Sequence, residues 1–428
     1  MKDLIEKVQE RTTTKTPYFL LSEDKIRENG KQFKELFGRI TIEEGNKTKF
    51  YYSVKTNYEV EVLKILKDIG FGGEISGELD LFFALKAGME GKDIIYDGPC
   101  KPDNDLIYAI KSNVNIFNLD SMTDAKNLKK IAKSLDLEHR VKVGFRVRPL
   151  LGSGYMSDLA TGFAKKFGVP YEDARIYYLK LLNVKEFDVC SISTNIGSQI
   201  LSPKHHIKAL DKLCEIVRYL DNIGVKIEEI NIGGGYPSPT LIKTTPLNLL
   251  LSKVGINREP KQADLDDFAR EISQFFVKKI NSLNLRTEPD LVFEPGRSIV
   301  SDAGVYICRV VDKKGNFLFI DGTNNHIPES LFFARREVFT LRESDNNRNY
   351  VVCGRTLNTA DIISQRARLP TNIRIGDIVI VKDAGAYTIT EAKQFTMMRP
   401  PVYMAYSNGK VKKIRREETP KDIERLMR

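Results

Sequence analysis

The residues best suited to chemistry stand where short β-rich runs end. Lys55 follows the run KFYYSV, and an amine that leaves a strand into a desolvated pocket has a lowered pKa and becomes nucleophilic. Glu294 stands near the end of DLVFEPG, where a buried carboxylate needs a cationic partner. Arg297, three residues further on, is suited to clamp a phosphate or a carboxylate. The alternative for Lys55 is an ordinary solvated lysine.

Two turns of small residues follow other runs of this kind. Gly233, Gly234 and Gly235 in NIGGGYP let the backbone approach an anion closely and aim its N–H groups at a phosphate. Ser198 in NIGSQ adds a hydroxyl that suits the same ligand. The alternative for both segments is a turn without a ligand.

The elements that must position these residues alternate regularly between strand and helix. Eight β-rich runs are spaced about 35 residues apart, enough for a strand, a crossover helix and two loops. Eight such units favour an α/β fold of the (β/α)8 TIM-barrel type, in which functional residues gather at the carboxyl ends of the strands. A doubly wound open sheet is the alternative. The runs are 49–54, 71–76, 93–98, 114–120, 141–149, 187–194, 227–235 and 290–296.

The pattern changes after about residue 305, where strands and turns follow one another with little helix. This predicts a mainly β C-terminal domain of sandwich or barrel type over 305–428, after a barrel over 31–304. The strand-like run PYFLLS (17–22) precedes the barrel. We therefore expect the segment 1–30 to join the β domain.

Length and composition limit the class of protein. A chain of 428 residues is too long for one ordinary core, and its composition is globular. The net charge of +10 is interleaved with acidic residues rather than gathered into a stripe, so we expect no nucleic-acid partner. No apolar run approaches the length of a membrane span, and neither a signal peptide nor metal-ligand spacing is recognisable. We expect a cytoplasmic protein with free thiols at Cys100, Cys190, Cys214, Cys308 and Cys353.

Taken together, the strand ends offer a lysine, two phosphate-binding turns, a buried glutamate and an arginine. These are the groups that pyridoxal 5′-phosphate requires: a Schiff-base amine, an anion site, and an acid beside the pyridine nitrogen. The sequence also resembles the fold type III (alanine racemase-like barrel) pyridoxal-phosphate decarboxylases, which include the diaminopimelate and ornithine/arginine decarboxylases. The resemblance rests, in order along the chain, on TPYFLL, YYSVKTN, FAKKFGVP, NIGSQI, NIGGGYP, FEPGR and DAGAY.

The resemblance implies a role for each matching residue. Lys55 would form the Schiff base, Glu294 would pair with the pyridine nitrogen, and Tyr387 of DAGAY would add a hydroxyl to the phosphate site. A homodimer with active sites at the interface is implied, in which Asp361 serves the partner's site. The remaining implied cofactor residues are Glu74, Arg146, Asn195, Ser198, Gly233, Gly234, Gly235 and Arg297.

The chain departs from the family at several positions. Asn195 replaces a histidine that stacks on the cofactor ring, and Leu357 in GRTLNTAD replaces a proton-donating cysteine. Cys353, four residues earlier, is a candidate substitute. Asn358 replaces a glutamate of the diaminopimelate decarboxylases. Their arginine and tyrosine for the distal carboxylate are also missing, with Pro328 or Glu329 and Phe332 at the nearest positions.

These departures leave the reaction and the substrate open. The leading hypothesis is removal of the α-carboxylate of an amino acid other than diaminopimelate, with a basic or specialised amino acid as substrate. Tyr387, Lys55 or a water is then the proton donor, and Asp361 meets a distal amine. A racemase and a catalytically silent homologue that acts by dimerising are the alternatives. His205 and His206 are expected at the surface, and His326 in a loop between the domains.

Overall fold

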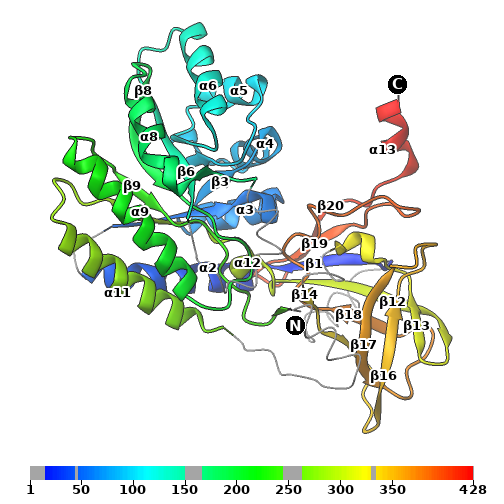
Figure 1. Ribbon diagram of the computed structural model, residues 1–428. Coiled ribbons are helices and arrows are strands. Elements are labelled where there is room, and N and C mark those ends of the chain that lie inside the picture. Colours follow the sequence, from blue (N-terminus) through cyan, green and yellow to red (C-terminus); the bar gives the residue numbers. More distant parts are fainter. Residues whose placement is uncertain (1–14, 44–46, 150–165, 244–262, 329–333, 428) are drawn as a thin grey trace. The chain divides into compact units, whose positions relative to one another are not determined.

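The structure is a computed structural model that describes residues 15–43, 47–149, 166–243, 263–328 and 334–427 (Figure 1). They divide into two compact units. The barrel unit comprises the described parts of 30–237 and 263–296, and the strand unit those of 1–29, 238–262 and 297–428. Packing therefore divides the chain after Gly296, eight residues before the boundary that the change in sequence pattern suggested. It also assigns the segment from Ser238 to the strand unit.

A closed barrel of eight parallel strands forms the centre of the barrel unit. Each strand pairs with the next along the chain, and β11 pairs with β2 to close the ring. All eight expected runs are strands, so the predicted barrel is confirmed. The strands are β2 (Thr48–Ser53), β3 (Gly72–Ile75), β4 (Ile94–Tyr96), β5 (Ile116–Leu119), β6 (Val141–Arg148), β8 (Phe187–Ser193), β9 (Glu229–Asn231) and β11 (Asp290–Phe293).

Amphipathic helices connect these strands. Ser121 and Asp264 cap the amino ends of α6 and α11, where their side chains accept hydrogen bonds from orphan backbone N–H groups. In α9 the buried positions recur every three or four residues, as expected of a helix with one face on the core. The helices are α2 (Glu23–Glu43), α3 (Val60–Asp68), α4 (Glu78–Lys86), α5 (Asp103–Lys111), α6 (Met122–Ser134), α8 (Tyr171–Leu182), α9 (Lys204–Asn222) and α11 (Leu265–Leu283).

The strand unit is built around one large sheet in the order β17-β16-β13-β12-β1-β19-β20, with β18 and β15 branching from β12. Here β1 (Tyr18–Ser22) pairs antiparallel with β12 and parallel with β19. The expectation that the N-terminal strand joins the β domain is confirmed. The other strands are β12 (Gly304–Lys314), β13 (Phe317–Ile320), β15 (Val338–Thr340), β16 (Asn347–Cys353), β17 (Ile362–Pro370), β18 (Ile378–Val381), β19 (Val402–Ala405) and β20 (Val411–Arg415).

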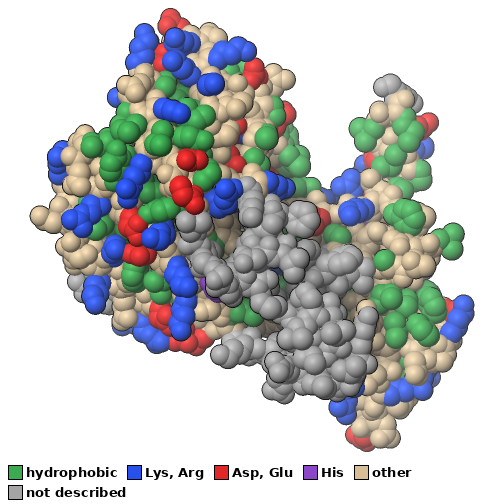
Figure 2. Space-filling model, viewed as in Figure 1, with side chains coloured by type: hydrophobic (Ala, Val, Ile, Leu, Met, Phe, Trp, Pro, Cys, Tyr) green, Lys and Arg blue, Asp and Glu red, His purple; other side chains and the backbone are tan. Residues whose placement is uncertain are grey.

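The surface agrees with the interleaved charge of the sequence. Figure 2 shows basic and acidic side chains mixed over the visible face of the barrel unit, without a single basic stripe. Within the described residues, no helix combines the length and the apolar character needed to cross a membrane.

Candidate active site

Lys55 and Glu74 form an ion pair at the carboxyl ends of adjacent barrel strands. Lys55 lies in the short helix η1 (Val54–Thr56) directly after β2, and Glu74 lies in β3. The Nζ atom of Lys55 lies 2.6 Å from Oε1 of Glu74, and the Ser53 hydroxyl donates to Oε2 at 2.6 Å. Burial by itself raises the pKa of Glu74, but the Lys55 ammonium and these hydrogen bonds outweigh it and hold that pKa below its usual value. Glu74 is therefore an ionised carboxylate that balances the charge of the Lys55 ammonium.

Glu294 follows β11 and is 1% exposed. Its Oε1 accepts a hydrogen bond from Nδ2 of Asn231 at 2.7 Å, while Oε2 has no partner among the described residues. Burial, followed by the neighbouring carboxylates of Asp97 and Glu74, raises the pKa of Glu294 well above its usual range. The protein thus holds a buried acid with one oxygen available to a ligand.

Asp97 is a third carboxylate here, and the sequence patterns did not single it out. It follows β4, and one oxygen of Asp97, one of Glu74 and one of Glu294 all lie within 4.8 Å of one another. Such a group also suits a cation, but the Lys55 ammonium already supplies positive charge beside Glu74. An acidic residue at a strand end was the available signal, and it is the same signal that identified Glu294.

The three glycines after β9 are required sterically. Gly233 and Gly235 have φ values of 70° and 93°, and a Cβ on Gly234 would lie 2.6 Å from the carbonyl oxygen of Glu294. The N–H of Glu294 donates to the carbonyl of Gly233, and the N–H of Ile200 to that of Gly235. The turn is therefore tied to the segments that carry Glu294 and Ser198.

His206 supports this turn from α9, so the expectation that it lies at the surface is wrong. The side chain is fully buried, stacks on Tyr236 and donates from Nε2 to the carbonyl of Gly234 at 2.9 Å. Burial lowers the pKa of His206 to about 4, which keeps the ring neutral. The helical spacing contained this information, because His206 lies on the same stripe as Leu210, Leu213 and the other buried residues of α9.

Asn231 links the glycine turn to the buried acid. Its Oδ1 accepts from the N–H of Gly233 at 2.8 Å, while its Nδ2 donates to Glu294. Asn195 makes a smaller turn contact, in which its Oδ1 accepts from the N–H of Gly197 at 3.1 Å. Ser198 is exposed in the same loop. Whether Asn195 contacts the cofactor ring and Ser198 its phosphate stays a prediction.

Arg146 of β6 adds positive charge to the acidic group, and it contributes to lowering the pKa of Glu74. Its guanidinium lies over the ring of Phe167 at 4.7 Å, within the described part of the stretch FAKKFGVP. The first residues of that stretch lie outside the described residues. The barrel unit therefore brings Lys55 and Glu294, which the strand-end pattern singled out, close to Glu74 and Arg146, which the resemblance implied.

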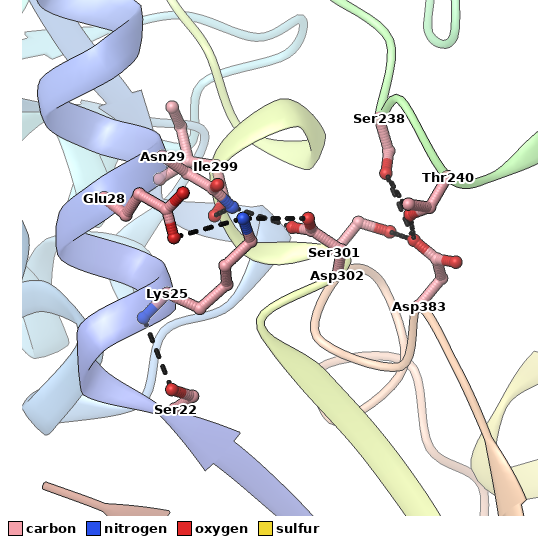
Figure 3. Close-up of polar contacts among 10 residues, drawn as sticks. All are labelled: Ser22, Lys25, Glu28, Asn29, Ser238, Thr240, Ile299, Ser301, Asp302 and Asp383. Atoms are coloured by element: carbon pink, nitrogen blue, oxygen red, sulfur yellow. Dashed lines mark hydrogen bonds and ion pairs between the residues drawn. The ribbon is translucent and has the colours of Figure 1, made fainter. Parts of the chain in front are cut away.

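Arg297 and Tyr387 belong to the strand unit. The Arg297 guanidinium lies 4.7 Å from the centre of the Tyr387 ring. Tyr387 has a φ of 53°, and the DAGAY segment that carries it begins at Asp383, whose Oδ1 accepts from three hydroxyls (Figure 3). These hydroxyls belong to Ser238, Thr240 and Ser301. The roles of Arg297 and Tyr387 at the cofactor phosphate stay predictions.

Asp361 is fully engaged within the strand unit. Its Oδ1 accepts from Thr323 Oγ1 and Asn324 N, and its Oδ2 accepts from the N–H and the hydroxyl of Thr356. The carboxylate therefore fixes the turn that presents Leu357, whose exposed fraction is 97%. This observation gives Asp361 a structural task, and a contact between Asp361 and a substrate amine stays a prediction.

Other predicted positions are less informative. Cys353 is buried, and burial, followed by the nearby Asp361, raises the pKa of its thiol. His326 is also buried: it lies in the short helix η3 (Asn324–His326) of the strand unit, where its Nδ1 bonds to the Tyr306 hydroxyl at 2.8 Å. Glu329 and Phe332 lie outside the described residues. The described cysteines are all free thiols.

Comparisons with known proteins agree with this geometry. The family model described as pyridoxal-dependent decarboxylase, pyridoxal binding domain, matches residues 23–301. The chain belongs to the pyridoxal-dependent decarboxylases. It is 28% identical to a diaminopimelate decarboxylase of Methanothermobacter thermautotrophicus over 95% of this chain and 90% of that protein. It is 29% identical to one of Archaeoglobus fulgidus over 89% and 85%. The crystal structure of the Methanocaldococcus jannaschii enzyme superposes with a TM-score of 0.85 at 25% identity, covering 97% of this chain and 92% of that one.

This enzyme is thus a carboxy-lyase that depends on pyridoxal 5′-phosphate and acts on an amino acid, as the resemblance implied. The residues of the barrel unit fit that cofactor. The unpartnered Oε2 of Glu294 is a suitable acceptor for the N–H of a protonated pyridine ring. The three glycines carry no side chains, so the backbone N–H groups of this turn are accessible to a phosphate.

Proposed function

We propose that this enzyme removes the α-carboxylate of a basic amino acid other than diaminopimelate, using the strand-end residues of its barrel. The observation that carries the proposal is a buried, ionised Glu74 paired with the partly exposed Lys55, beside a buried Glu294 that keeps one oxygen available. Pyridoxal phosphate supplies an electrophilic carbon for amines and a ring that takes up the electrons of the broken bond.

The side chains have complementary tasks in this proposal. Lys55 is the amine to which the cofactor attaches, and Glu74 accepts the proton that the Lys55 ammonium must lose before it reacts. Glu294 accepts a hydrogen bond from the pyridine nitrogen, and Asn231 fixes the orientation of that carboxyl group. Asn195, Ser198 and the glycine turn contribute the remaining barrel contacts, and Arg297 and Tyr387 contribute to the phosphate site.

The proposed substrate differs from that of the similar proteins, which are named diaminopimelate decarboxylases. The support is the stretch DGTNNHIPESLFF, which lacks the arginine and tyrosine that the resemblance implies for a distal carboxylate. A buried carboxylate without a cationic partner costs several kcal/mol, so a substrate with a distal amine suits this stretch better.

The assembly that we propose is a cytoplasmic homodimer. Leu357 supports the dimer, because a rigid turn holds an apolar side chain almost completely exposed. The free thiols of the described chain support a reducing compartment.

The test is a panel of amino acids assayed for carbon dioxide release by the loaded enzyme. Lysine, ornithine or arginine should be decarboxylated faster than diaminopimelate, and Lys55→Ala should abolish both turnover and the visible absorbance of the bound cofactor. Lys64→Ala, which removes an exposed lysine of α3, is the matched control and should change neither. Fastest release from diaminopimelate would refute the substrate proposal. Loss of substrate chirality without carbon dioxide would indicate a racemase, and no reaction with any amino acid would indicate a silent homologue.

A further inference from the structure

Asp97 has no task in the mechanism above, yet it lies among the residues that do. Its backbone N–H donates to the carbonyl of Ile75 at 2.9 Å, which fixes the start of the loop after β4. The side chain is 3% exposed, and its Oδ1 has no hydrogen-bond partner among the described residues. A buried polar atom without a partner is costly, and such atoms are found where a ligand or a proton completes the site.

The charged groups around Asp97 come from every neighbouring element. Glu74 of β3 and Glu294 after β11 are negative or acidic, while Lys55 of η1 and Arg146 of β6 are positive. Lys101, in the loop after β4, also contributes to the potential at Asp97. Its ammonium is directed elsewhere, however, because it donates to the backbone carbonyls of Gly98 and Asn118.

Three buried carboxylates cannot all ionise beside so few cations, since like charges at this separation disfavour one another. Glu74 carries the charge because Lys55 and Ser53 contact it directly. Burial, followed by the charge of Glu74, raises the pKa of Asp97 above its usual value. The ionisation of Asp97 is therefore coupled to the state of the Lys55–Glu74 pair.

We propose that Asp97 is a positioning residue that sets, through Glu74, the pH at which Lys55 gives up its proton. In this step the N–H bond of the Lys55 ammonium breaks and an O–H bond forms on Glu74, with no change of oxidation state. A neutral Asp97 leaves Glu74 as an ionised partner for Lys55. An ionised Asp97 adds a second negative charge, which stabilises the ammonium and delays its deprotonation.

The inference rests on the proposed function of Lys55 as the cofactor amine, and the experiment separates the two. The rate at which the full-length, cofactor-free protein forms its Schiff base with added pyridoxal phosphate is followed by visible absorbance and measured against pH, because only the deprotonated Lys55 amine reacts. In Asp97→Asn the midpoint should fall by on the order of one pH unit, because the variant cannot acquire the negative charge that Asp97 gains as the pH rises and that favours the ammonium. Asp97→Glu, which keeps an ionisable carboxyl group, should stay closer to wild type. Asp93→Asn, at the exposed opposite end of β4, should titrate as wild type does.

Unchanged midpoints in Asp97→Asn would overturn the inference. So would a variant that folds, as shown by circular dichroism, but no longer binds the cofactor, because Asp97 would then hold the cofactor instead of tuning Lys55. A failure of the proposed function gives a different result. Borohydride reduces a Schiff base to a stable amine, so if Lys55 is not the cofactor amine, reduction of the loaded wild-type protein leaves Lys55 unmodified.

Discussion

Asn231 illustrates how one uncharged side chain organises a charged site. Its amide oxygen accepts from Gly233 and its amide nitrogen donates to Glu294, so a single side chain fixes the phosphate turn and the buried acid together. Because Asn231 is almost completely buried, no water replaces these contacts when they are lost. The sequence contained this residue in the NIGGGYP motif, but the motif drew attention to the glycines.

We therefore expect Asn231→Ala to destabilise the cofactor-free protein. It leaves the N–H of Gly233 and one oxygen of Glu294 without partners, and the free energy of unfolding should fall by about 1–3 kcal/mol. Urea denaturation measures this change. Asn183→Ala, which removes an exposed amide that donates to Leu179 of α8, is the control and should cost less than about 0.5 kcal/mol. Equal effects of the two substitutions would contradict this account of Asn231.

The sequence located those site residues whose type is rare in their setting, while their roles stay predictions. A lysine or glutamate at the end of an apolar run is conspicuous, and Lys55 and Glu294 do lie together in the barrel. Asp97 escaped notice because its importance depends on which strands are neighbours, and only the closed barrel brings β4 and β11 residues to one place. The structural task of Asp361 was equally hard to predict, because it depends on a hydrogen bond from Thr323, which lies far away in sequence.

At the scale of elements, α9 does more than cover the barrel. Its first turn brings the neutral ring of His206 against the carbonyl of Gly234, so the helix and the glycine turn are fixed to one another. Strand positions were predictable because a strand shows its burial directly in the sequence, as alternating or continuous apolar residues. The partner of a helix side chain was not predictable, because it depends on the packing angle between elements.

This contact makes the stability of the protein sensitive to pH. The pKa of His206 is about 4 in the folded protein and about 6.5 when unfolded, so folding disfavours its protonation. The stabilisation is complete above pH 6.5 and is lost as the pH falls towards 4, by up to about 3 kcal/mol. His206→Gln keeps a donor without titrating, so its unfolding free energy should fall less steeply between pH 6.5 and pH 4.

Urea unfolding of both proteins at several pH values measures this difference. His326 titrates in the same range, because burial also lowers its pKa to about 4, so the variant should retain that part of the slope. If the unfolding free energies of wild type and His206→Gln fall equally steeply with pH, the buried contact with Gly234 does not prevent protonation of the His206 ring.

At the scale of the whole molecule, the proposed homodimer makes a prediction about shared active sites. If Lys55 of one subunit works with Asp361 of the other, neither Lys55→Ala nor Asp361→Ala is active alone. In a re-equilibrated equal mixture, half of the dimers are mixed and each has one intact site, so about a quarter of the wild-type activity should return. Carbon dioxide release from the mixture measures this recovery.

The folded state of Asp361→Ala must be verified first, because its carboxylate holds the turn around Thr356. Circular dichroism and sedimentation of the single variant serve this purpose. A folded, dimeric Asp361→Ala protein that gives no recovery when mixed would place each active site within one subunit.

The position of β1 in its sheet has a consequence for biosynthesis. Both edges of β1 are covered by later strands, and its neighbour β19 emerges from the ribosome roughly 380 residues after it. At about 5–20 residues per second, the nascent strand waits tens of seconds for that neighbour, while every strand of the barrel is made in between. Of the described strands, β1 leaves the ribosome first and is thus among the last to be fully paired. During that interval its apolar side chains and unpaired backbone groups are natural targets for chaperones.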